Sequence, residues 1–191
     1  MTERFAEALS FAARLHQQQV RKGSGVPCIS HLLAVTALVI EAGGDEDEAI
    51  AALLHDAVED QGGAETREKI RRRFGDRVTA IVDGCSDTDQ TPKPPWKDRK
   101  LAYIAHIATA DRSMLLVSSA DKLHNSRSIV SEYREVGDAI WERFNGRRAG
   151  TLWYYRAVTD AIRDAGGTPL SAALEETVAE LERLTASSAD S

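Results

Sequence analysis

The sequence has few of the features that mark secreted, membrane or nucleic-acid-binding proteins. It has 191 residues but only two cysteines, Cys28 and Cys85, which are too few for a disulfide framework. No apolar run approaches the roughly 20 residues of a membrane span, and the N-terminus lacks the apolar core of a signal peptide. The formal net charge of -6 argues against a basic surface for nucleic acid. We therefore expect a cytoplasmic protein without nucleic-acid or membrane partners, and the composition leaves the oligomeric state open.

Proline is also scarce, and its distribution favours a helical protein. Three of the five prolines, Pro92, Pro94 and Pro95, crowd into one segment and exclude a regular helix there. Elsewhere apolar residues recur at helical spacing, and no alternation typical of strands is present. We predict an all-α bundle of about eight to ten helices, in a single domain over 1–185 with a frayed tail at 186–191. The predicted helices cover 3–20, 30–42, 46–60, two short segments joined at Gly75, 96–110, 115–135, 138–165 with possible breaks at Gly146 and Gly150, and a last helix after Thr168 and Pro169.

Four residues form a candidate metal site. They are His31, the adjacent pair His55 and Asp56, and Asp121. Two imidazoles and two carboxylates suit Mn²⁺, Fe²⁺ or another borderline divalent cation better than Ca²⁺. Because neighbouring residues on a helix diverge by about 100°, His55 and Asp56 can reach one ion only if it lies off the helix edge. Other helices must then supply the remaining ligands.

Each of these residues also has an ordinary explanation. A His-Asp dipeptide is common by chance, His31 suits a helix start, and Asp121 suits an N-cap for KLHNSRSIV. However, the segment LLHDAVED gathers a histidine and three acidic residues at the end of the apolar helix AIAALL. Burying that charge without a partner would be costly. A metal ion is the simplest partner, and contacts from lysine or arginine are the structural alternative.

Glu59 and Asp60 follow the His-Asp pair closely enough to share its helical face. A carboxylate beside a metal-bound water can position that water and accept its proton. The alternative is a solvated acidic helix end, although the helix dipole disfavours carboxylates at that end. We interpret Glu59 and Asp60 as the catalytic acids.

Several cations are candidates for contacting an anionic substrate. Arg21 and Lys22 precede a glycine-containing loop close in sequence to His31, which suits a phosphorylated ligand. An ordinary charged helix C-terminus explains the pair equally well. Lys122 lies beside Asp121, where it can meet phosphate oxygens. Further basic residues follow the proline segment or Asn125: Lys97, Arg99, Lys100 and Arg127. Such charged runs most often form solvated faces.

These pieces occur in an order that resembles a known family. The segments are HQQQVRKGSGVPCISHLLAVTALVIEAGG, AIAALLHDAVEDQGG, IRRRFGDRVTAIVDGCSD, DRKLAYI and SSADKLHNSR, over about residues 11 to 130. They resemble the HD-domain phosphohydrolases, and more narrowly the (p)ppGpp hydrolase domain of RelA/SpoT-type proteins and its stand-alone Mesh1-like form. The ordered set is far more specific than the His-Asp dipeptide alone.

The resemblance implies an all-helical HD-domain fold and a small-molecule nucleotide substrate. The implied reaction removes the 3′-pyrophosphate of guanosine tetra- or pentaphosphate, an alarmone of the stringent response. In the implied site, Mn²⁺ is held by His31, His55, Asp56 and Asp121, and Glu59 and Asp60 act on the attacking water. The resemblance also implies that Arg21 and Lys22 line the nucleotide pocket and that Asn125 contacts the nucleotide sugar.

Two other functions remain open from the sequence. The same metal chemistry can act on another nucleotide or phosphorylated metabolite, because the segment RFNGRRAGTLWYYRAV matches the family only loosely. Alternatively, an HD fold can serve as a non-catalytic nucleotide-binding regulator. His16, His106 and His124 have no acidic partner in the pattern, and we expect them to be structural.

Overall fold

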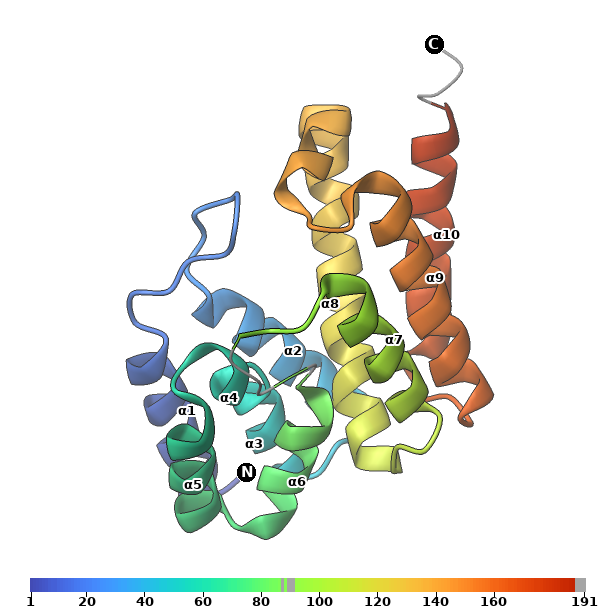
Figure 1. The fold of residues 1–191 in the computed structure, drawn as a ribbon. Helices are drawn as coiled ribbons and strands as arrows, with labels where there is room; N and C mark the ends of the chain where they lie inside the picture. The colour runs from blue at the N-terminus through green and yellow to red at the C-terminus, as the bar shows by residue number, and fades with distance from the viewer. Residues whose placement is uncertain (87, 89–91, 188–191) are drawn as a thin grey trace.

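A computed structural model of the chain describes residues 1–86, 88 and 92–187. Within these ranges the chain forms ten α-helices and one 3₁₀ helix, and its only β pairing is an isolated bridge between Val20 and Pro27 (Figure 1). None of the described helices is both long and apolar enough to cross a bilayer. The predicted all-α bundle is thus confirmed. Its elements are α1 (Glu3–Leu15), α2 (Ile29–Glu41), α3 (Glu46–Leu54), α4 (Ala57–Asp60), α5 (Gly63–Phe74), α6 (Asp76–Cys85), α7 (Trp96–Ile107), α8 (Arg112–Val136), η1 (Gly137–Arg143), α9 (Arg147–Asp164) and α10 (Ser171–Ser187).

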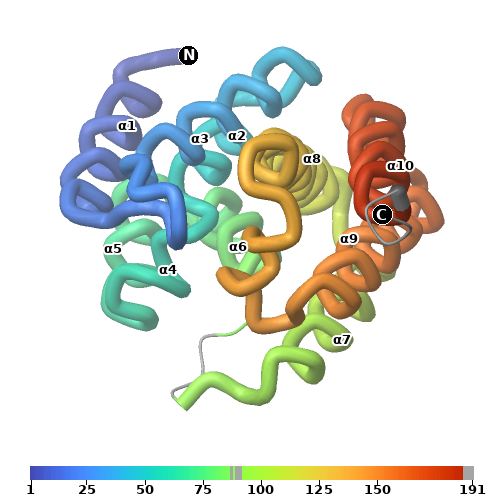
Figure 2. Tube along the Cα trace, turned by 90° about the horizontal axis from the view of Figure 1, so that it is seen from above, coloured from blue at the N-terminus to red at the C-terminus, as the bar shows by residue number. Residues whose placement is uncertain are grey.

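The long helix α8 runs through the middle of the molecule. Its 25 residues make it about 37 Å long. Asp111 caps its start by accepting a hydrogen bond from the Met114 N–H, and Gly137, at a φ of 60°, ends it. In both views α1 to α6 lie on one side of α8, whereas α7, α9 and α10 lie on the other (Figures 1 and 2). This central helix therefore belongs to both halves of the bundle.

The hydrophobic core has a cluster on each side of α8. The first cluster joins α1, α2, α3, α5 and α6 to Leu116, Val117 and Ala120 of α8. The second joins α7, η1, α9 and α10 to other buried residues of α8, among them Leu123 and Ile129. Burial of these apolar side chains against both faces fixes α8 in position and rotation. The polar residues that α8 carries between its apolar ones are therefore held rigidly.

The predicted helix over 46–60 is interrupted. Asp45 caps its start, because its side chain accepts from the Glu48 N–H at 3.0 Å while Glu48 accepts from the Asp45 N–H at 2.7 Å. Helix α3 nevertheless ends at Leu54, and the short α4 begins only at Ala57. The break falls on the His-Asp pair, so the assumption of one continuous helix through these residues was wrong.

The predicted helix over 138–165 is also divided, near one of the two glycines. The segment Gly137–Arg143 is a 3₁₀ helix, and α9 starts after Gly146. A Cβ atom at Gly146 would lie 2.7 Å from the Trp96 ring, and one at Gly150 would lie 3.2 Å from it. Only glycine lets the Trp96 indole pack this close to the start of α9.

The remaining boundaries follow the predictions with small shifts. The first helix ends at Leu15 instead of residue 20, and α10 begins at Ser171, after Thr168 and Pro169. Helix α10 runs to Ser187, and residues 188–191 of the predicted tail lie outside the described residues. Both cysteines are free thiols. The assignment of 1–185 to a single domain stays a prediction.

Candidate metal centre

The four predicted ligands converge from two helices and a helix break. His31 lies in the first turn of α2, Asp121 in the middle of α8, and the adjacent His55 and Asp56 form the break between α3 and α4. Both histidines and Asp121 are almost fully buried, with 1%, 3% and 7% of their surface exposed. Asp121 therefore belongs to the interior of α8, and the alternative of an N-cap is wrong.

The ligand atoms are spaced as they would be around one ion. His31 Nε2 lies 3.3 Å from His55 Nε2 and 3.3 Å from Asp121 Oδ1. His55 Nε2 lies 3.3 Å from Asp56 Oδ1 and 3.6 Å from Asp121 Oδ1. Atoms bound at about 2.0–2.2 Å to one cation lie about 3.0–3.6 Å from each other. The ligand atoms of His31, His55 and Asp56 all lie within 4.8 Å of one another, and Asp121 approaches this group through the two imidazoles.

Hydrogen bonds behind the histidines aim their Nε2 atoms at this centre. His55 Nδ1 lies 2.8 Å from the Ala52 carbonyl oxygen, to which it donates, so Nε2 is the nitrogen that can bind an ion once it loses its proton. His31 Nδ1 lies 2.8 Å from His124 Nδ1. Burial and the neighbouring His31 lower the pKa of His124 to about 4, so a neutral His124 is ready to accept from His31. The expectation of a merely structural His124 misses this contact, because no sequence pattern pairs residues 31 and 124.

The electrostatics of the centre call for positive charge. Burial by itself lowers the pKa of His55, but Asp56 and Asp121 outweigh it and raise that pKa to about 9. Burial by itself raises the pKa of Asp121, but Lys122 and the histidines hold it well below its usual range. Asp121 thus stays ionised beside Asp56 and the two imidazoles, and a divalent cation at this point can replace the proton that the raised pKa keeps on His55. The residues present therefore fit a metal ion.

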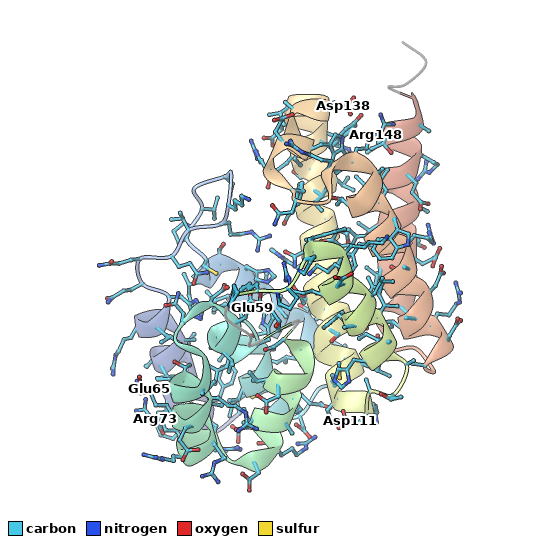
Figure 3. The ribbon with its side chains drawn as sticks, viewed as in Figure 1. Glu59, Glu65, Arg73, Asp111, Asp138 and Arg148 are labelled. Carbon is cyan, nitrogen blue, oxygen red and sulfur yellow. The ribbon has the colours of Figure 1, made fainter. Side chains whose placement is uncertain are left out.

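The acidic pair on α4 stands beside this centre. Figure 3 shows Glu59 at the seam between the two halves of the bundle, whereas Glu65 lies on the outer side of α5. Glu59 Oε1 accepts from Lys93 Nζ at 2.8 Å, and Asp60 Oδ2 accepts from Gln19 Nε2 at 2.7 Å. Partial desolvation, and then the charge of Asp56, raise the pKa of Asp60, although the residue is exposed at the cleft wall. Asp60 is therefore a better proton acceptor near neutral pH than an ordinary aspartate.

Two adjoining cavities open from the centre and form one cleft. Their volumes are about 310 and 350 Å³, and Asp56 lines both. The first also contains Asp60, and the second contains Glu59 and Asp121. The predicted substrate residues all lie on the cleft wall: Arg21 in the first cavity, Lys122 in the second, and Lys22 and Asn125 in both.

A short loop brings Arg21 to α8. The Arg21 N–H donates to the Val26 carbonyl oxygen at 2.8 Å, which closes a loop whose Gly23 has a φ of 91°. Arg21 Nη2 then donates to Asn125 Oδ1 at 2.7 Å. Asn125 Nδ2 in turn donates to Asp121 Oδ1. The asparagine thus connects the arginine of the loop to the predicted metal ligand Asp121.

Lys122 pairs with its neighbour Asp121, whereas the sequence predicts a contact with the substrate phosphate. Its Nζ lies 2.5 Å from Asp121 Oδ2, and 4.8 Å from the centre of the Tyr103 ring. Its charge is therefore directed first at the ligand Asp121, although the side chain also lines the cleft. Among the other basic candidates, Arg99 and Lys100 line the second cavity, whereas Lys97 lies 2.9 Å over the centre of the Trp153 ring.

Several cleft residues were not assigned by the sequence reasoning, and three of them line both cavities. Arg143, Phe144 and Tyr155 line both cavities. They come from η1, from the break after it and from α9, in the segment that matches no family motif closely. Nothing in the sequence links position 143 to the metal ligands, because the connection depends on how η1 folds back along α8.

Comparison with known proteins agrees with this geometry. Residues 8–152 match the HD domain family. The chain is 40% identical over 129 residues to a GTP pyrophosphokinase of Streptomyces coelicolor. The aligned region is 67% of this chain but only 15% of that protein. It is 36% identical over 126 residues to the human guanosine-3′,5′-bis(diphosphate) 3′-pyrophosphohydrolase MESH1, which covers 64% of this chain and 68% of that protein.

A solved structure is similar over almost the whole chain. It is that of a metazoan ortholog of SpoT, described as hydrolysing ppGpp. The TM-score is 0.77 at 28% sequence identity, over 93% of this chain and 94% of the other. The matched family region contains every predicted metal ligand, from His31 to Asp121. The chain belongs to the HD domain family.

Proposed function

We propose that the chain is a divalent-metal-dependent phosphohydrolase that removes the 3′-diphosphate of ppGpp or pppGpp. The convergence of His31, His55, Asp56 and Asp121 at the floor of a cleft that also contains cations carries the proposal. The names of two relatives, the human protein and the SpoT ortholog, support the choice of substrate. We propose Mn²⁺ as the metal, with another divalent transition metal as the alternative, on the basis of the mixed nitrogen and oxygen ligands.

The acidic pair provides the proton chemistry in this proposal. When bound, a divalent cation lowers the pKa of a coordinated water and screens the charge of the phosphate. Asp60, with its raised pKa, accepts the proton that the water loses as its oxygen bonds to phosphorus. Glu59, held by Lys93, orients that water. The bond between phosphorus and the 3′ oxygen breaks, and that oxygen leaves as a hydroxyl group by taking up the proton that Asp60 accepted from the water.

The cleft wall provides the substrate contacts. Arg21 and Lys22 meet phosphate oxygens, because both cations lie in the cavity that also contains Asp56 and Asp60. Asn125, already fixed by Arg21 and Asp121, contacts the nucleotide sugar. Lys122 keeps Asp121 ionised and oriented as a ligand. These roles, the cytoplasmic location and a part in the stringent response stay predictions.

Release of pyrophosphate from ppGpp tests the function. Purified protein with Mn²⁺ should release pyrophosphate and GDP, chelation should stop the release, and the Asp56→Ala variant should be inactive. The Asp160→Ala variant, which changes a surface aspartate paired with Arg163, should match the wild type. Absence of turnover at every divalent-metal loading would refute the proposal.

A panel of phosphorylated compounds separates the remaining alternatives. Turnover of other nucleotides with ppGpp untouched would establish the broader HD phosphohydrolase. Tight ppGpp binding without turnover would establish a non-catalytic regulator. Selective turnover of ppGpp supports the proposed substrate.

A further inference from the structure

Helix α8 carries a row of polar residues along the cleft. Asp121, Asn125, Ser128 and Glu132 follow one another at spacings of four, three and four residues, so they share one face of the helix. Asp121 lines the second cavity, Ser128 and Glu132 line the first, and Asn125 lines both. At a rise of about 1.5 Å per residue, Glu132 lies about 16 Å along the helix axis from Asp121. The row therefore extends along the cleft, from the predicted metal ligand Asp121 to Glu132 at the far end of the cleft.

Arg143 sits at that far end. Its guanidinium forms an ion pair with Glu132, and both side chains are 29% exposed. Its aliphatic part lies against Gly23, where any Cβ atom would overlap the Arg143 side chain. Arg143 thus spans the gap between η1 and the loop that carries Arg21. It also lines a third cavity of about 560 Å³ beyond that loop.

Cations gather in the first cavity. Arg21, Lys22 and Arg143 provide three of them, Glu132 pairs with Arg143, and the other two carboxylates of this cavity, Asp56 and Asp60, belong to the metal end. A guanidinium has five N–H donors, and Glu132 engages the Nη1 group of Arg143. The remaining donors suit the oxygens of a phosphate group better than a neutral base.

A nucleotide with phosphates on both its 3′ and 5′ carbons has two separate anionic groups joined by the ribose. The metal centre takes the group that is cleaved, so the other group must lie elsewhere in the cleft. We propose that Arg143 binds the 5′-diphosphate of the substrate, opposite the metal end, and so selects nucleotides that carry phosphates at both ends. This inference rests on the proposed function.

The experiment compares two substrates that differ only at the 5′ end. For Arg143→Ala, KM for ppGpp should rise about tenfold or more, as expected for the loss of a charge-assisted hydrogen bond, with kcat changed less than twofold. For guanosine 3′-diphosphate, which has a free 5′-hydroxyl, KM should change less than twofold. Arg143→Lys should recover part of the lost affinity for ppGpp.

Two further variants separate binding from structure. Glu132→Gln breaks the same ion pair but keeps the guanidinium, so KM for ppGpp should not rise. Arg134→Ala removes an α8 arginine that pairs with Glu180 outside the cleft, and both KM values should stay at the wild-type level. An equal loss for both substrates in Arg143→Ala, no loss, or a loss in Glu132→Gln as large as in Arg143→Ala would overturn the inference.

Calorimetry with GDP keeps this test independent of turnover. GDP carries the 5′-diphosphate and lacks the 3′ group, so Arg143→Ala should weaken its binding about tenfold. If the wild type does not hydrolyse ppGpp, the proposed function fails. If it does, and GDP binds Arg143→Ala as tightly as it binds the wild type, the assignment of Arg143 fails alone.

Discussion

Replacing Lys122 with methionine should destabilise the metal-free protein strongly. The Lys122 and Asp121 side chains are only 11% and 10% exposed, and their charged atoms lie 2.5 Å apart. Methionine is close to lysine in length and flexibility, so the change removes the charge with little loss of volume. Loss of one partner of a buried ion pair costs about 3–5 kcal/mol, because the other charge is left uncompensated. We expect a value near 3 kcal/mol, since His55 Nε2 lies 3.6 Å from Asp121 and supplies part of the missing charge.

A bound divalent cation should reverse most of this loss. Asp121 is a proposed ligand, so a metal ion compensates its charge when lysine is absent. With saturating Mn²⁺, the difference in unfolding free energy between Lys122→Met and the wild type should shrink to about 1 kcal/mol or less. Adding Asp121→Asn to Lys122→Met should recover stability in the metal-free protein, because neither charge is then buried alone.

Urea unfolding followed by circular dichroism, with chelator and with Mn²⁺, measures these differences in unfolding free energy. The reasoning fails if Lys122→Met loses less than about 1 kcal/mol without metal, a value ordinary for exposed pairs. It also fails if Mn²⁺ stabilises the variant no more than the wild type, since Asp121 would then not share its charge with the ion.

Two further predictions concern single contacts. His124→Phe removes the acceptor that orients His31, so Mn²⁺ affinity measured by titration should fall about 10- to 100-fold. If the variant binds Mn²⁺ as tightly as the wild type does, the 2.8 Å contact does not orient His31. Burial by itself raises the pKa of Asp45, but its hydrogen bonds with the Glu48 N–H and Arg77 outweigh it, so the pKa is lowered. The charge of Asp45 therefore stabilises the fold above about pH 4, and this contribution is lost as the pH falls through the folded-state pKa. Asparagine caps equally well without charge, so the stability advantage of the wild type over Asp45→Asn should disappear in acid, and an advantage that persists at pH 2 would contradict the assignment.

Much of the fold was predictable, because helix boundaries depend on local chemistry. The cap at Asp45, the glycine at position 75 and the Thr168–Pro169 pair each act within one turn of chain, and α3, α5, α6 and α10 begin or end near them. The break between α3 and α4 was not predictable in this way. His55 and Asp56 lie at this break, where they meet His31 and Asp121, and these two residues are distant in sequence.

The candidate site divides along the same line. Residue type and order predicted the four ligands, Glu59 and Asp60, because few other chemistries use two imidazoles and several carboxylates in an otherwise apolar setting. The contact of His124 with His31 and the position of Arg143 at the cleft depend on how α2 and η1 pack against α8. Sequence alone therefore determined which residues can bind a metal ion and that they are carried on helices, since both follow from side-chain chemistry and local periodicity. Only the tertiary structure decided their partners and the length of the cleft, since these arise from apolar packing on both sides of one long helix.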